Sequence, residues 1–195
     1  MINPTYPAPS PWAAALTTKL DSLKKSAEQA RNAHNSARTA SDALTAELRV
    51  SESASGTVVA YDGHSRNQQT EVLREIAFSH CGLTMSLSRV WHRAAYAYAY
   101  AVSCLLVDLT VHGQEARVTV SHSADMPVPP LDTAGIRQAH RQAVTAQLPV
   151  ISSEQPYGAT PWARSADAWH QYAETADAHL RTLLTAAHAQ TQSGR

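Results

Sequence analysis

The sequence predicts a mostly helical α+β protein, in which a long coiled-coil-like N-terminal helix and a long C-terminal helix flank a small antiparallel sheet. Three observations support this fold class. Small and apolar residues recur at 4-3 spacing through the first fifty residues, a helix-start signal near residue 10 recurs near residue 160, and alternating apolar residues lie between the two.

The composition limits the classes of function. With 195 residues the chain is long enough for one domain with a core, and 16 basic residues balance 16 acidic ones. A neutral chain gives no overall case for a nucleic-acid partner. The N-terminus has neither a basic nor an apolar segment of a signal peptide, and the longest apolar stretch, 94–107, is shorter than a membrane span. We therefore expect a cytoplasmic protein with no membrane partner.

The first element is a long helix over residues 11–49, preceded by an extended, proline-containing arm over 1–10. Ser10 can cap the helix and Pro11 suits its first position. No proline or glycine follows until Gly56, so the helix can run for about 58 Å at 1.5 Å per residue. A helix of this length needs a lateral partner.

One face of that helix carries a stripe that predicts the partner's position. The stripe has leucines at both ends and small side chains in its middle. In an antiparallel pair of copies, leucines would therefore face leucines and small side chains would face small side chains. The sequence therefore predicts an oligomer seam, although packing of the same face within the chain is the alternative. The N-terminal stripe consists of Leu16, Leu20, Leu23, Ala27, Ala30, His34, Ala37, Ser41, Leu44 and Leu48.

A mixed α/β core is predicted over residues 50–125. Residues 55–63 have the pattern of a turn, a short β-branched strand and a second turn, and residues 103–122 alternate as in a β-hairpin. Residues 68–102 carry both helical and period-two spacing. We interpret 84–102 as a helix and take Gly82 as the stop of the helix before it.

The C-terminal helical segment spans 133–195 and follows a proline-rich linker over 126–132. Asp132 can cap a helix over about 133–147, and Thr160 with Pro161 repeats the start signal of the first helix. The last helix has its own 4-3 stripe, which makes it the internal candidate to pair with the first helix. Its members are Trp162, Ala166, Trp169, Ala173, Ala176, Leu180, Leu183 and Ala187.

No pattern in the sequence predicts a catalytic, metal or cofactor site. The ten histidines lack the short spacings of metal-binding motifs, and no glycine-rich phosphate loop is present. Ser79, His80 and Cys81 are neighbours in sequence, which does not bring their side chains together. Cys81 and Cys104 lie in apolar stretches and are expected to be buried free thiols. We expect no enzyme, although a site assembled only in three dimensions remains an alternative.

A local basic line on the first helix is the one feature that suggests nucleic acid. Lys24, Arg31 and Arg38 recur every seven residues and Lys25 is adjacent, so the four could follow a phosphate backbone. A solvated helix face explains the same pattern.

One resemblance to a known family points in the same direction. A long helix that exits into the run Ser-Ala-Ser-Gly-Thr-Val-Val-Ala-Tyr-Asp-Gly at 53–63, followed by an apolar helix with Val90, Ala94 and Ala95, resembles the YbaB/EbfC nucleoid-associated proteins. The resemblance covers about residues 16–102. It implies a dimer that binds DNA, with helices flanking a small sheet.

The sequence thus favours a non-enzymatic, helix-mediated oligomerising or assembly protein, either a structural component or an adaptor. Its expected partner is a second copy or another helix. A YbaB/EbfC-like DNA-binding dimer is the alternative function.

Overall fold

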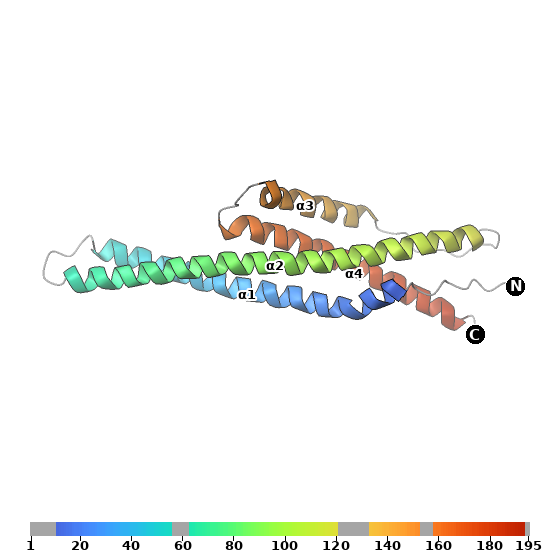
Figure 1. Cartoon of the computed structure of the whole chain (residues 1–195), viewed down its shortest axis with the longest axis horizontal. Helices are drawn as coiled ribbons and strands as arrows, with labels where there is room; N and C mark the ends of the chain where they lie inside the picture. The colour runs from blue at the N-terminus through green and yellow to red at the C-terminus, as the bar shows by residue number, and fades with distance from the viewer. Residues whose placement is uncertain (1–10, 56–62, 121–132, 153–157, 194–195) are drawn as a thin grey trace.

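The computed structural model describes residues 11–55, 63–120, 133–152 and 158–193, and these form four helices without a strand (Figure 1). They are α1 (Pro11–Ser55), α2 (Gly63–Val120), α3 (Thr133–Ser152) and α4 (Ala159–Ser193). Gly158 precedes α4 with φ at 93°, a left-handed conformation that a residue without a Cβ adopts easily. Within these ranges the fold is a helical bundle.

The predicted α+β fold class is therefore wrong. The segment 103–120, predicted as most of a β-hairpin, continues α2, and Gly82 lies inside α2 rather than at its end. No proline interrupts 63–120, and extending an existing helix costs much less than starting a new element. The alternation of leucines and valines in this segment is a weaker determinant than that continuity.

Several predicted segments lie outside the described residues. These are the arm over 1–10, most of the short strand region at 55–63, the last two residues of the predicted hairpin, and the linker over 126–132. The helical predictions in the described ranges are confirmed and extended: 11–49 corresponds to α1, 84–102 lies within α2, and 133–147 lies within α3.

Helices α1 and α2 form an antiparallel hairpin. The rings of His34 and Trp91 lie 5.2 Å apart, while nearer the connection the hydroxyls of Ser51 and Thr70 are 2.7 Å apart. Residue numbers therefore rise along α1 as they fall along α2.

Helix α4 completes a three-helix core by lying parallel to α2 and antiparallel to α1. Along α2, Arg89 stacks over the ring of Trp162, and the hydroxyl of Ser103 is 2.7 Å from that of Tyr172. Helix α3 runs back along α4 and covers its outer side (Figure 1), where the side-chain oxygen of Gln147 accepts a hydrogen bond of 3.1 Å from the Trp169 indole.

The buried core is centred where α1, α2 and α4 run side by side. It consists mainly of alanines and large aromatic rings, an alternation of small and large groups that lets helices approach closely. Its most completely buried apolar members are Ala27, Ala95, Tyr98, Ala99, Val102, Ala143, Ala166, Ala173, Ala176 and Leu180.

The α1–α2 hairpin extends beyond this core as a two-helix arm. We define the arm as residues 35–55 of α1 and 63–88 of α2, the part that precedes the contact of α2 with Trp162 near the start of α4 (Figure 1). Inside the arm the buried side chains are small or hydroxylated, and the Thr84 hydroxyl donates 2.9 Å to the carbonyl of His80. With only two helices, much of the arm surface of α2 stays uncovered.

Candidate interaction surface

The N-terminal stripe of α1 packs against its own chain. Leu20, Ala27, His34 and Ala37 are buried, and Leu23, Ala30, Ser41, Leu44 and Leu48 are half-buried, while the side chain of Leu16 lies outside the described set. The face that the sequence predicts to be an oligomer seam is thus covered by helices of the same chain. A second copy could use it only if α1 left α2.

The internal partner of this stripe is chiefly α2, with α4 contributing charged contacts. The His34 ring packs on Trp91 of α2. From α4, Arg181 donates 2.6 Å to the Asp21 carboxylate of α1. The sequence had suggested the C-terminal helix as the internal partner of this stripe. Helix α4 does lie beside α1, but α2 is its main partner.

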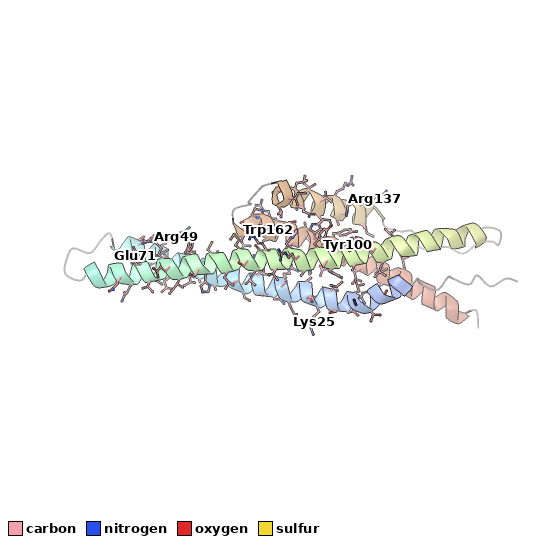
Figure 2. The ribbon with its side chains drawn as sticks, viewed as in Figure 1. Lys25, Arg49, Glu71, Tyr100, Arg137 and Trp162 are labelled. Carbon is pink, nitrogen blue, oxygen red and sulfur yellow. The ribbon has the colours of Figure 1, made fainter. Side chains whose placement is uncertain are left out.

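The basic line on α1 is largely paired with carboxylates. Lys24 lies 3.9 Å from Asp177, Arg31 lies 3.8 Å from Asp167, and Arg38 lies 3.8 Å from Asp42 of its own helix. Lys25 is exposed and points away from the bundle (Figure 2). Because nearby carboxylates offset three of the four cations, the line presents a weaker positive field than its sequence indicates.

A buried polar network joins the three core helices. The Tyr98 hydroxyl donates 2.9 Å to the carboxylate of Asp177, which is only 2% exposed, and Arg181 Nε donates to both oxygens of that carboxylate at 3.0 and 3.1 Å. Burial and the bond to Asp177 raise the pKa of Tyr98 well above its usual value. Hydrogen bonds to Asp21 and Asp177 likewise raise the pKa of Arg181. The network satisfies a buried charge and fixes the register of α4.

In a second buried polar region, near the start of α4, several polar atoms lack hydrogen-bond partners. The His92 ring meets Trp162 edge to face at 5.3 Å between ring centroids. Burial, followed by the charge of Arg93, lowers the pKa of His92. His170 Nε2 lies 3.4 Å from the Glu174 carboxylate without hydrogen-bond geometry. In the part of the chain with described side chains, the buried polar atoms lacking a hydrogen-bond partner include His92 Nε2, both His170 ring nitrogens, Trp91 Nε1, Trp162 Nε1 and Ser165 Oγ.

These groups do not assemble a metal site. Among the described residues, no three His, Cys, Asp or Glu side chains converge in a way that could hold an ion. Ser79 and Cys81 are exposed on α2 and His80 between them is half-buried, so successive side chains diverge around the helix. The prediction that both cysteines are buried is wrong for Cys81, which is exposed, while Cys104 is partly buried.

The clearest apolar surface without a partner is a stripe of side chains on the outside of α2. It runs along the arm and ends just beyond it, at Val90. We call it the outer stripe: it consists of Val72, Ile76, Ser79, Leu83, Ser86 and Val90. These residues follow 4-3 spacing, and all of them are exposed, Leu83 to 48%. Residues 76–88 contain no Asp, Glu, Lys or Arg. Depletion of charge around exposed apolar side chains is typical of an interface core.

Phe78 and charged residues border the outer stripe. Phe78 is 82% exposed, the highest value among the large hydrophobic side chains described. Glu75 lies at one end, and Arg89, held over Trp162 at 5.3 Å, lies at the other. Figure 2 shows Glu71 near the far end of the arm and Trp162 beside α2 in the core. The surface thus has an apolar centre between an acidic and a basic end.

No helix among the described residues is long and apolar enough to cross a membrane. Comparison of the chain with protein-family models, curated proteins and solved structures finds no match.

Proposed function

We propose that this protein is a non-enzymatic, helix-mediated assembly protein that associates with a second copy of itself through the outer stripe of α2. The single observation that carries this proposal is the exposure of Val72, Ile76, Leu83 and Val90 at coiled-coil spacing, around a central run, 76–88, that contains no charged side chain. The N-terminal stripe of α1, in contrast, is already covered within the chain.

The expected affinity follows from the amount of apolar surface. Each of the four side chains is about half exposed, and burying the exposed half contributes on the order of 1 kcal/mol. Two copies together would gain on the order of 8 kcal/mol, which is comparable with the roughly 4–15 kcal/mol that association costs. At the lower end of that cost about 4 kcal/mol remains, so we expect a weak, concentration-dependent dimer with a Kd of about 1 mM.

A matched pair of exposed leucines tests the proposal. Leu83 of the outer stripe is 48% exposed and Leu148 of α3 is 50% exposed, so replacing either with Glu should leave the fold intact. Sedimentation velocity up to about 1 mM should show a dimer for the unmodified chain and for Leu148→Glu, and a monomer for Leu83→Glu.

Two results would contradict the proposal. One is a monomeric unmodified chain over the whole concentration range. The other is a dimer that survives Leu83→Glu and is lost in Leu148→Glu, which would place the contact on α3, where Val144, Leu148 and Ile151 are also exposed.

A further inference from the structure

We infer that the two copies pair antiparallel about a two-fold axis near the middle of the outer stripe, so that Glu75 of each copy faces Arg89 of the other. The inference rests on the proposed function and adds the direction and register of the contact. It follows from the order of large, small and charged residues along this one exposed face.

The sizes of the side chains fit an antiparallel register. In that register Val72 meets Val90 of the second copy, Ile76 meets its Ser86, and Leu83 meets its Ser79. Every large side chain except the end valines then lies opposite a serine, which leaves room for the helices to approach. The two-fold axis produces the same contacts with the copies exchanged, so one surface serves both partners.

The charges beside the stripe select the same register. Glu75, Gly82 and Arg89 follow one another every seven residues along one flank of the stripe, and all three are exposed. Antiparallel pairing about Gly82 places Glu75 of each copy beside Arg89 of the other, twice in one dimer. The ring of Trp162 already holds the Arg89 guanidinium at this flank.

Gly82 lies where the flanks of the two copies would cross. No atom lies within 4 Å of the position that a Cβ would occupy there. A glycine with open space in front of it permits close approach of a second backbone. In the register set by Glu75 and Arg89, Gly82 of one copy faces Gly82 of the other.

Parallel pairing is disfavoured by the same residues. It would place each residue of the stripe beside the same residue of the second copy, so Ser79 would face Ser79 and Ser86 would face Ser86. Arg93, which continues the 4-3 spacing, would meet the same arginine. In the antiparallel register Arg93 instead faces Gln69 of the second copy, which is exposed and uncharged.

Disulfide cross-linking between different chains distinguishes the two directions. Two full-length variants, Val72→Cys and Val90→Cys, are prepared with Cys81 and Cys104 replaced by Ser, one of them isotopically labelled, and mixed under mild oxidation at high concentration. Antiparallel pairing predicts that disulfides form chiefly between the two different variants. In the same pairing, two copies of Val72 lie about 27 Å apart along the helices and cannot be bridged.

Charge reversal provides an independent measurement of the register. Glu75→Arg alone places two like-charged pairs across the dimer and should weaken association about tenfold, as should Arg89→Glu alone. The chain carrying both changes restores opposite charges and should regain the affinity of the unmodified chain.

The outcomes separate this inference from the proposed function. Two results overturn the antiparallel register but leave self-association standing. The first is a dimer that forms disulfides only between identical variants, or forms none. The second is a dimer in which the losses of affinity from Glu75→Arg and Arg89→Glu add up in the double variant instead of cancelling. An unmodified chain that stays monomeric overturns both.

Discussion

The hydroxyl of Tyr98 on α2 donates a hydrogen bond of 2.9 Å to the carboxylate of Asp177 on α4, and both side chains are buried. The two residues are 79 positions apart in sequence, so this contact is a direct report of how α4 docks on the α1–α2 hairpin. Its energetics can be tested with single-atom changes.

Tyr98→Phe should destabilise the protein by about 1–3 kcal/mol, because it removes a donor from a buried carboxylate and leaves the ring packing intact. Urea denaturation measures this loss in the free energy of unfolding. Tyr100→Phe on the exposed side of the same helix is the control and should change stability by less than about 0.5 kcal/mol. Equal effects for the two changes would show that the buried bond contributes nothing.

The two carboxylates that contact Arg181 should differ in importance. Asp177 is almost completely buried, whereas the Asp21 side chain is 78% exposed. Asp177→Asn should cost about 1–3 kcal/mol, since it weakens several buried hydrogen bonds, and Asp21→Asn should cost less than about 1 kcal/mol because solvent screens a surface ion pair. A larger loss for Asp21→Asn in thermal or urea unfolding would contradict this ranking.

Stability should fall in acid because of His92, whose pKa is lowered in the folded chain, first by burial and then by Arg93. Above about pH 6.5 the ring is neutral in both states and has no effect. Below that value the unfolded chain binds the proton more readily, so the free energy of unfolding decreases until the pH passes the folded pKa. Urea titrations near pH 7.5 and 5.5 should show a smaller decrease in His92→Gln than in the unmodified chain, and an identical decrease would exclude His92 as a cause.

The paired state of the basic line predicts weak DNA binding. With carboxylates near Lys24, Arg31 and Arg38, we expect no binding of duplex DNA tighter than about micromolar at physiological salt. Fluorescence anisotropy across a salt series measures this. Tight binding that weakens steeply with salt, and that is lost when all three cations are replaced by Gln, would instead favour the DNA-binding alternative suggested by the YbaB/EbfC resemblance.

The sequence was informative where a helix begins with a clear signal. Ser10 with Pro11, and Thr160 with Pro161, predicted starts that the structure places at Pro11 and Ala159. The spacing of the N-terminal stripe also predicted which face of α1 is covered. It could not predict what covers that face, because the same small and apolar pattern suits a helix of the same chain and a helix of another.

Helix α2 shows where local patterns mislead. Its segment 103–120 alternates like a strand, yet it continues the helix, and Leu105 is buried two helical turns beyond Tyr98. The outer stripe was missed because two of its six positions are serines, so the apolar residues alone do not show a continuous seam. Recognising it required knowing that the opposite side of α2 packs on α1.

The most direct test of the account is hydroxyl-radical footprinting of the unmodified chain at low and high protein concentration. The measurement compares side-chain labelling of Leu83 and Val90 on the outer stripe with that of Leu148 and Ile151 on α3, all of which are exposed in the single chain. We expect labelling of Leu83 and Val90 to decrease as concentration rises, while labelling of Leu148 and Ile151 stays constant. Constant labelling of the outer stripe, or a decrease confined to α3, would contradict the central claim.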